Sequence, residues 1–193
     1  PRVWQHTLPP DSPIAPMVCW RPNALYNDGA VHARYRQAIS DSLSLIEPHE
    51  LREVTHRAAD SLIRGFAGHG EADLVAQYAG QLPLLVFNAI FGLPDAHGPG
   101  MVAAMSKMFD CASPEEVAEA FPVIEWYVTD LVALKKRCRG QDVTSWLLDH
   151  PARLTDREVV DQLLTAMSAG YTPMTSLISN ALSRMLSDPR YYR

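Results

Sequence analysis

The sequence predicts a mainly α-helical fold with little β structure. Apolar residues recur at the spacing of a helix along most of the chain after residue 28. Two capping boxes, SPEE at residues 113–116 and TDRE at residues 155–158, indicate where two of the helices begin. The chain contains no internal repeat and no low-complexity tract, so these helices are expected to form one mostly helical architecture.

Composition limits the classes of function. The chain has 193 residues, 47% of them hydrophobic, which suits a substantial core. Seventeen Lys and Arg against 22 Asp and Glu give a net charge of −5, which argues against a nucleic-acid partner. The longest apolar stretch, residues 82–93, is too short to span a bilayer, so no membrane partner is expected.

The cysteines and histidines indicate no metal site. Cys19, Cys111 and Cys138 are widely spaced and form no CxxC pair, which disfavours a disulfide framework and a cysteine-rich zinc site. A reducing, cytoplasmic location fits this spacing best. The histidines lack metal-ligand spacing with an acid or a cysteine, so no metal-ligating residue is expected.

The first elements are expected to be a loop and two helices. Residues 1–27 are predicted to form a proline-rich loop, because six of the 15 prolines lie in the first 22 residues and proline lacks the N–H that a helix needs. A short helix follows Asp28, its candidate N-cap, and an amphipathic helix follows from residue 47 to a glycine-rich end. Their apolar faces are Val31, Tyr35, Ala38 and Ile39, and then Leu51, Val54, Ala58, Leu62 and Phe66.

The middle of the chain is expected to add one strand or turn and several helices. Residues 71–79 suggest a short strand or an extended turn, and residues 81–91 a buried helix. Residues 100–110 suggest a helix whose methionines are either core filler, the preferred interpretation, or an adaptable contact surface. A helix with Pro114 at its first position follows, and then a short helix closed by His150 and Pro151.

A long buried helix is predicted over residues 155–187. Val159, Leu163, Met167, Gly170, Met174, Leu177, Ala181 and Met185 recur along it at helical spacing. Pro173 lies in its middle and cannot donate to the carbonyl of Ala169, which costs roughly 3 kcal/mol. The helix is therefore expected either to tolerate a kink or to open a groove beside Gly170, with Ser168 and Thr172 offering hydroxyls to a water or a ligand.

Several motifs in this order resemble the cytochrome P-450 superfamily in its bacterial soluble form. The stretch LLTAMSAGYTPMTSLISNALSRMLSDP is similar to the long distal helix that crosses the heme, and Ala169 and Gly170 match the start of its Ala/Gly-Gly-x-Asp/Glu-Thr pattern. DGAVHARYRQAIS resembles the family's His-x-x-x-Arg helix, with His32 and Arg36 as the matching pair. GEADLVAQYAGQLPLLVFNAIFGLP resembles the acidic turn, short strand and helix that follow.

The resemblance implies a partial P-450-like domain over residues 1–193. Residues 28–150 would form helices over the heme and the pocket, and residues 155–187 the distal helix. His32 and Arg36 would bind heme propionates, because residues four apart share a helix face. Taken without the resemblance, this pair is a solvated polar face.

The same resemblance assigns residues to oxygen activation and to the substrate. Ala169 and Gly170 would lie against the heme, and Gly170, Thr172 and Pro173 would form the catalytic part of the site. The substrate would be a small organic molecule, contacted by the loop from Trp4 to Trp20 and by the segment around Met105 and Met108.

Two departures from the family pattern affect the predicted chemistry. Thr172 stands where the family has an acid, and Pro173 where it has the threonine that assists proton delivery. Thr172, Thr175, substrate hydroxyls or ordered water would then have to replace that relay. The family's Glu-x-x-Arg helix and its heme-binding cysteine loop lie downstream of this helix, so the iron thiolate ligand is not expected within these residues.

These observations predict a heme-dependent monooxygenase that receives electrons from a ferredoxin or a similar donor. The loss of the acid and the alcohol leaves a second interpretation, a P-450-like protein that serves as a non-catalytic binding or partner-recruiting scaffold. A third interpretation is an unrelated helical interaction domain, which would bind no heme.

Overall fold

A computed structural model describes residues 19–109 and 113–191, and most of these residues are helical. No strand occurs within these ranges, which agrees with the predicted fold class. The elements are η2 (Ala24–Tyr26), α2 (Gly29–Ser44), α3 (Pro48–Phe66), η3 (Val75–Ala79), α4 (Gln81–Phe91), α5 (Gly98–Phe109), α6 (Pro114–Arg137), α7 (Val143–Asp149), α8 (Asp156–Ser187) and η4 (Pro189–Tyr191).

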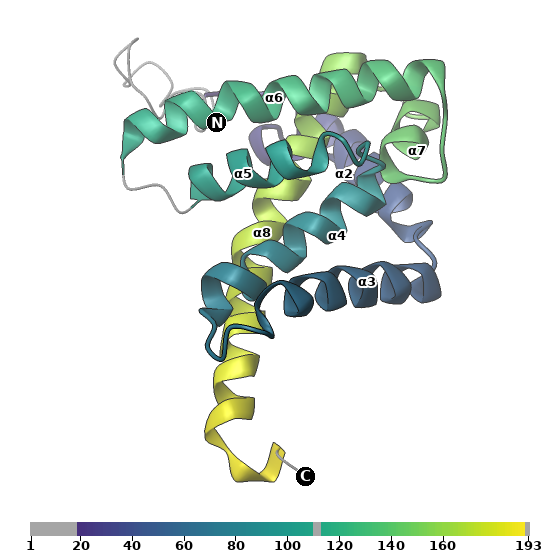
Figure 1. The fold of residues 1–193 in the computed structure, drawn as a ribbon. Helices are drawn as coiled ribbons and strands as arrows, with labels where there is room; N and C mark the ends of the chain where they lie inside the picture. Colours follow the sequence, from purple (N-terminus) through teal and green to yellow (C-terminus); the bar gives the residue numbers. More distant parts are fainter. Residues whose placement is uncertain (1–18, 110–112, 192–193) are drawn as a thin grey trace.

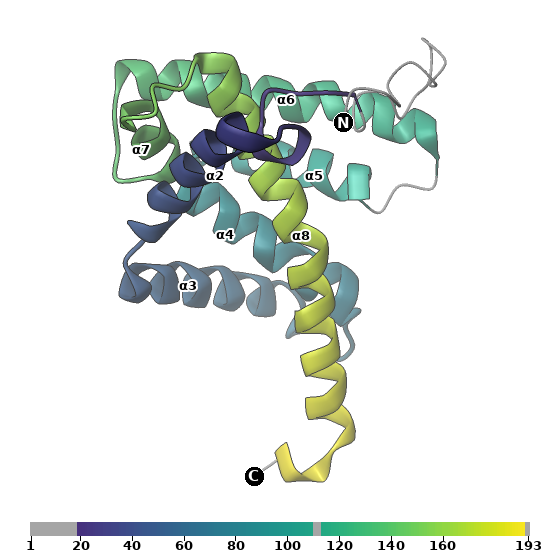
Figure 2. The same ribbon diagram turned by 180° about the vertical axis from the view of Figure 1, so that it is seen from behind.

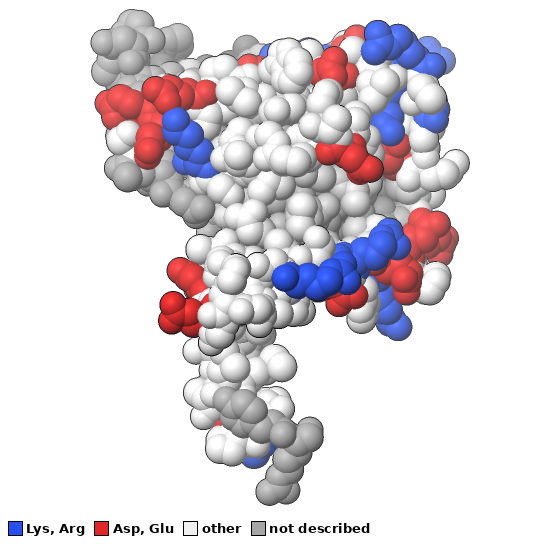
Figure 3. Space-filling model, viewed as in Figure 1, with Lys and Arg blue, Asp and Glu red and all other residues white. Residues whose placement is uncertain are grey.

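Helix α8 organises the arrangement of the other helices. It packs against α4, α6, α7 and η3, and α5 and α6 lie together on one side of it (Figure 1). Seen from behind, α8 is in front and its C-terminal half extends beyond the other helices (Figure 2). The surface of that extension carries few charged side chains, whereas charges of both signs gather along α3 (Figure 3).

A helix begins at each of the two predicted capping boxes, and the reciprocal pair of hydrogen bonds is found at the start of α8. Thr155 accepts a hydrogen bond from the backbone N–H of Glu158, and the Glu158 carboxylate accepts one from the N–H of Thr155. Ser113 accepts one from the N–H of Glu116 at the start of α6. Asp28 precedes α2 as predicted, but its side chain makes no capping hydrogen bond. Local sequence therefore defines where the two longest helices, α6 and α8, begin.

The core lies between α4, α5, α6, α7 and α8. Met101, Met105 and Met108 of α5 are all buried, which confirms the interpretation of these methionines as core filler. On α3 no residue is fully buried, and Leu51 of its expected apolar face is exposed. Val31 of α2 is also exposed, so the buried face of α2 begins only at Tyr35.

The prediction for residues 71–79 was wrong, because Val75–Ala79 forms a π-helix rather than a strand or an extended turn. The Asp73 carboxylate accepts hydrogen bonds from the N–H groups of Val75 and Ala76 at 2.9 and 3.0 Å, which starts the helical turn. The N–H of Gly80 then bonds to the carbonyl of Val75, five residues earlier, which is the spacing of a π-helix.

The prediction of a wholly buried α8 was also wrong. Val159, Leu163 and Met167 are buried, but Met174, Leu177 and Met185 are 43%, 63% and 48% exposed. The apolar periodicity continues along the whole helix, but the fully buried residues end at Tyr171. Periodicity identifies the apolar face of a helix but not the length over which other parts of the chain cover it.

The ion pair between Arg34 and Glu158 joins α2 to the start of α8. The Arg34 guanidinium donates to both carboxylate oxygens of Glu158, at 2.8 and 3.1 Å, and the Tyr35 hydroxyl donates to one of them at 2.7 Å. Hydrogen bonds from Arg34, and then from Tyr35 and the Thr155 N–H, lower the pKa of Glu158 to about 2 from its ordinary value of 4.5. Desolvation and the Glu158 charge raise the pKa of Tyr35 to about 12.

Replacing Glu158 is expected to destabilise the protein in a pH-dependent way. Because the folded state lowers the pKa of Glu158, its stabilisation is complete above pH 4.5 and disappears as the pH falls toward 2. Urea unfolding of the full-length Glu158→Gln protein should show a free energy of unfolding about 2 kcal/mol lower at neutral pH. The deficit should shrink as the pH falls through this window.

Glu119→Gln is the matched control for this experiment. Glu119 pairs with Lys107 at 2.6 Å, but its side chain is 70% exposed, so its removal should leave stability unchanged. A Glu158→Gln deficit that stays constant with pH would contradict the assigned role of the ionised carboxylate.

Candidate functional site

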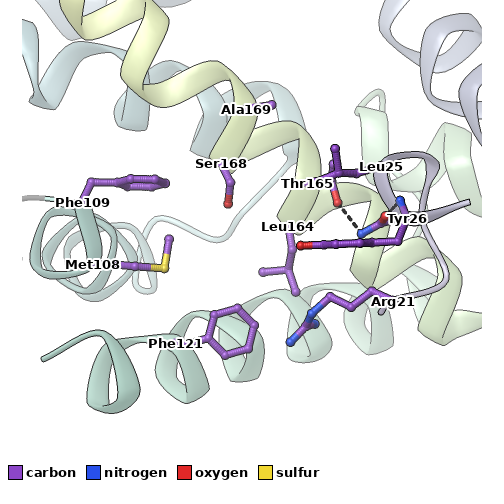
Figure 4. Close-up of a pocket in the computed structure, with 11 residues that line it drawn as sticks. Arg21, Leu25, Tyr26, Met108, Phe109, Phe121, Leu164, Thr165, Ser168 and Ala169 are labelled. Carbon is purple, nitrogen blue, oxygen red and sulfur yellow. Dashed lines mark hydrogen bonds between the residues drawn. The ribbon is translucent and has the colours of Figure 1, made fainter. Parts of the chain in front are cut away.

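A cavity of about 310 Å³ lies between α5, α6, α8 and the segment that contains η2 (Figure 4). Its walls are mostly apolar, and it reaches the exposed face of α8 at Ala169. The size and the apolar character suit a small organic ligand. Eleven residues line the cavity: Arg21, Asn23, Leu25, Tyr26, Met108, Phe109, Phe121, Leu164, Thr165, Ser168 and Ala169.

Buried polar contacts fix the segment that forms one wall of this cavity. Asp161 of α8 is fully buried, and its carboxylate pairs with Arg21 at 2.7 Å and with Arg157 at 2.6 Å. Arg157 also pairs with Glu125 of α6 at 2.8 Å. Since a buried carboxylate is costly unless it is paired, this network holds Arg21 against α6 and α8.

A second contact joins the same segment to the middle of the cavity. Asn23 is buried, and its side-chain amide donates to the Thr165 hydroxyl at 2.7 Å; this bond is the dashed line that ends at Thr165 in Figure 4. The Thr165 hydroxyl in turn donates to the carbonyl of Asp161 at 2.7 Å. The segment is thus bonded to α8 one turn before Ala169.

Aromatic side chains complete the walls. The Arg21 guanidinium lies over the Phe121 ring, 4.5 Å from its centroid, and the Phe109 ring stacks on Tyr171 of α8 at 4.5 Å. Met108 is both buried in the core and part of the cavity lining, so core filling and ligand contact are compatible for this residue. The expected contact loop, Trp4 to Trp20, lies mostly outside the described residues, but the residues directly after it line the cavity.

The predicted residues of α8 divide between two environments. Ala169, Thr172 and Pro173 are exposed on a face that no other described element covers, whereas Gly170 is half-buried. Thr175, a proposed substitute in the relay, has a buried hydroxyl without a hydrogen-bond partner among the described residues. Of these two threonines, only Thr172 is exposed on the same face as Pro173.

The groove predicted beside Gly170 is filled. A Cβ atom added to Gly170 would lie 2.6 Å from Cζ of Phe87 on α4, so the Phe87 ring occupies the space that a side chain would need. Helix α8 continues through Pro173 without a break. Gly170 therefore allows close packing of α4 on α8 and opens no space for a ligand on that side.

His32 and Arg36 are both exposed on α2, four residues apart. Nδ1 of His32 lies 2.8 Å from the carbonyl oxygen of Ala24. Because a carbonyl only accepts, Nδ1 carries the hydrogen and Nε2 is left for a second partner. Arg36 has no ion-pair partner among the residues that the structure describes.

Sequence reasoning found Ala169, Ser168 and the methionine segment but not most of the cavity wall. Thr165 and Leu164 lie one turn before the recognised motif, and helical spacing alone could have identified them. The contacts of Asn23 and Arg21 with α8 span 142 and 140 residues of sequence, and no local signal indicates them.

Neither a metal centre nor a membrane span is evident in the described ranges. No group of three or more His, Cys, Asp or Glu side chains in residues 19–109 and 113–191 is placed to hold a metal ion. None of the helices there is both long and apolar enough to cross a membrane.

Adding a methyl group at Gly170 should be destabilising only while Phe87 is present. Overpacking typically costs 1–3 kcal/mol, and the higher helix propensity of alanine offsets up to about 1 kcal/mol of this. Gly170→Ala in the full-length protein should lower the free energy of unfolding by about 1 kcal/mol. In a Phe87→Leu background the same change should become neutral or stabilising.

A double-mutant cycle by urea unfolding measures this coupling. Gly65→Ala on α3 is the control, because a Cβ there meets nothing within 4 Å and should only stabilise the helix. Additive effects of Gly170→Ala and Phe87→Leu would show that the ring does not limit this position.

Comparison with known proteins gives one consistent answer. No protein-family model matches the chain. It is 26% identical over 171 residues to cytochrome P450 107B1 of Saccharopolyspora erythraea, covering 87% of this chain and 42% of that protein. It is also 26% identical over 190 residues to vitamin D(3) 25-hydroxylase of Pseudonocardia autotrophica, covering 96% and 47%. The chain thus spans less than half the length of these relatives.

Solved structures agree with these sequence matches. CYP154C4 from a Streptomyces species is 27% identical, with a TM-score of 0.75 over 94% of this chain and 47% of that one. The mixed-function P450 MycG has the same fold, with a TM-score of 0.78, 24% identity, and coverage of 89% and 45%. In sequence and in fold, the chain is therefore similar to the N-terminal part of bacterial members of the cytochrome P450 superfamily.

Proposed function

We propose that the complete protein is a heme-dependent monooxygenase that oxidises a small, mostly apolar organic molecule. The observation that carries this proposal is the cavity of about 310 Å³ that reaches Ala169 on the exposed face of α8. Relatives named as hydroxylases support the class of reaction. Vitamin D(3) and mycinamicin IV are named for those relatives, and they do not identify the substrate of this protein.

The described residues fit a heme on the exposed face of α8. Ala169, Thr172 and Pro173 carry short side chains there, which would let a planar macrocycle approach the helix closely. His32 and Arg36 lie on α2, which the Arg34–Glu158 pair holds against the start of α8. The two basic side chains would bind the heme propionates, and His32 would need a hydrogen on Nε2 as well as on Nδ1 to donate to a carboxylate.

The iron ligand is not assigned to a residue of this stretch. Cys138 is the C-cap residue of α6, Cys19 lies before η2, and neither belongs to α2 or α8. Cys111 lies outside the described residues.

The heme, when bound, supplies the iron centre at which dioxygen is activated. The residues of this chain would provide the surroundings for that chemistry. The apolar walls of the cavity would exclude water and hold the substrate beside Ala169. Pro173 has no group that can donate a proton, so the Thr172 hydroxyl, together with water or a substrate hydroxyl, would have to hold protons at this face.

A non-catalytic binding scaffold is the second candidate function. The replacement of the acid and the alcohol by Thr172 and Pro173 favours it. The cavity and the exposed basic pair favour the enzyme, because a scaffold needs neither. A ferredoxin-type electron donor and a cytoplasmic location belong to the proposal for the enzyme.

Removing the basic pair should weaken heme binding. Full-length protein with His32→Ala and Arg36→Ala should lose heme at least several-fold faster to an apomyoglobin acceptor than the unchanged protein, because two charge-assisted contacts to carboxylates are lost. Arg52→Ala with His56→Ala on α3 is the matched control, since this exposed pair has the same spacing. Equal rates of heme loss in the two double variants would remove His32 and Arg36 from the site.

Restoring a hydroxyl at position 173 should improve the coupling of reductant consumption to product. Pro173→Thr is expected to raise the ratio of product formed to NADPH consumed by about twofold or more. The reason is that a positioned proton donor accelerates the step that leads to product, so less of the reductant is consumed without product formation. Pro122→Thr removes a proline inside α6 and controls for relief of helix strain. Unchanged or lower coupling would show that the surroundings of Pro173 already deliver protons.

A further inference from the structure

The polar groups of the cavity are almost all engaged with one another. Asn23 and Thr165 bond to each other, and Thr165 also bonds to the carbonyl of Asp161. The Arg21 guanidinium is neutralised by Asp161 at 2.7 Å and lies 3.6 Å from Glu125. Asn23 and Thr165 cannot bind a ligand without giving up a partner that is itself partly or fully buried. The charge of Arg21 is already paired, and Tyr26, which also lines the cavity, is not free either.

Ser168 is the exception among these polar groups. Within the part of the chain that the structure describes, its hydroxyl has no hydrogen-bond partner, and in Figure 4 it points toward the space between Phe109, Met108 and Leu164. Serine and threonine inside a helix commonly donate to the carbonyl four residues earlier. Thr165, Thr55 and Ser187 do so here at 2.7 Å each, whereas Ser168 does not.

The position of this hydroxyl determines what it can contact. Ser168 precedes Ala169, where the cavity meets the exposed face of α8, so a group bound to Ser168 lies next to the proposed reaction site. The walls around it are the apolar side chains of Met108, Phe109 and Leu164. A hydroxyl in such surroundings gains most from a single acceptor or donor on an otherwise apolar molecule.

We propose that Ser168 is the specificity-determining residue of the cavity and selects substrates that carry a carbonyl or hydroxyl oxygen on a hydrocarbon frame. The inference rests on the proposed function and adds the class of substrate. Ser168 donates a hydrogen bond to this oxygen and thereby orients the frame against Ala169. The neighbouring Thr165 hydroxyl does not contribute, because its hydrogen is already donated to Asp161.

A matched pair of probes tests the proposal. 2-Adamantanone carries a carbonyl, and 2-methyleneadamantane has the same shape with CH2 in place of the oxygen. Dissociation constants for both are measured by equilibrium dialysis with full-length, heme-loaded protein. Ser168→Ala should weaken binding of the ketone by about threefold to tenfold, the value of one net hydrogen bond, and leave the alkene unchanged. Ser168→Thr, which keeps the hydroxyl, should retain the ketone preference.

Two further variants separate the possible outcomes. Ser183→Ala on the same helix lies outside the cavity lining and should change neither constant. A ketone preference that survives Ser168→Ala, or that disappears in Thr165→Val instead, would overturn the assignment to Ser168 and leave the proposed function in place. Failure of the unchanged protein to bind either probe would contradict the cavity itself as the substrate site, and both proposals with it.

Discussion

The buried carboxylate of Asp161 is the constraint on which the cavity depends. It is fully buried in the first half of α8, and two arginines neutralise it, Arg21 from the segment before η2 and Arg157 from its own helix. A carboxylate without partners at this depth would be strongly unfavourable, so the pairing with Asp161 stabilises Arg21 in its position against α8. The contact that satisfies the charge therefore also brings the wall of the cavity to α8.

The cavity also depends on small residues that lie on different sides of α8. Toward α4 it has Gly170, where the absence of a side chain lets the Phe87 ring approach. Toward the uncovered face it has short side chains, and toward the cavity it has Ser168 and Ala169. Small residues thus serve two purposes on one helix turn: close packing of helices on one side and an accessible surface on the other.

The position of Pro173 on α8 explains why this proline does not disturb the packing of the helices. Helix α8 remains continuous through it, and its ring is on the exposed face, away from the Phe87 contact. Packing of α4 therefore does not depend on the missing backbone hydrogen bond. The consequences of this proline are chemical rather than structural, because a hydroxyl or an acid at this position would be the natural proton donor.

The sequence by itself determined the helical class, the starts of α6 and α8, the methionine core of α5 and the order of motifs that resembles the superfamily. These features depend on local rules, namely capping hydrogen bonds between residues three apart and apolar spacing within one helix. Local rules also suggested a short strand or an extended turn over residues 71–79. There the Asp73 carboxylate instead starts a helical turn, which propensity alone does not reveal.

Only the tertiary structure decided which parts of α8 are buried, what fills the space beside Gly170 and which residues form the cavity. Arg21 and Phe121 reach the cavity, and Phe87 reaches Gly170, from other segments of the chain, and a spacing pattern within α8 contains no information about them. The same holds for Ser168. The sequence shows a serine at this position, but only the contacts of Asn23 and Thr165 show that, among the described residues, those two polar groups are engaged with each other while the Ser168 hydroxyl is not.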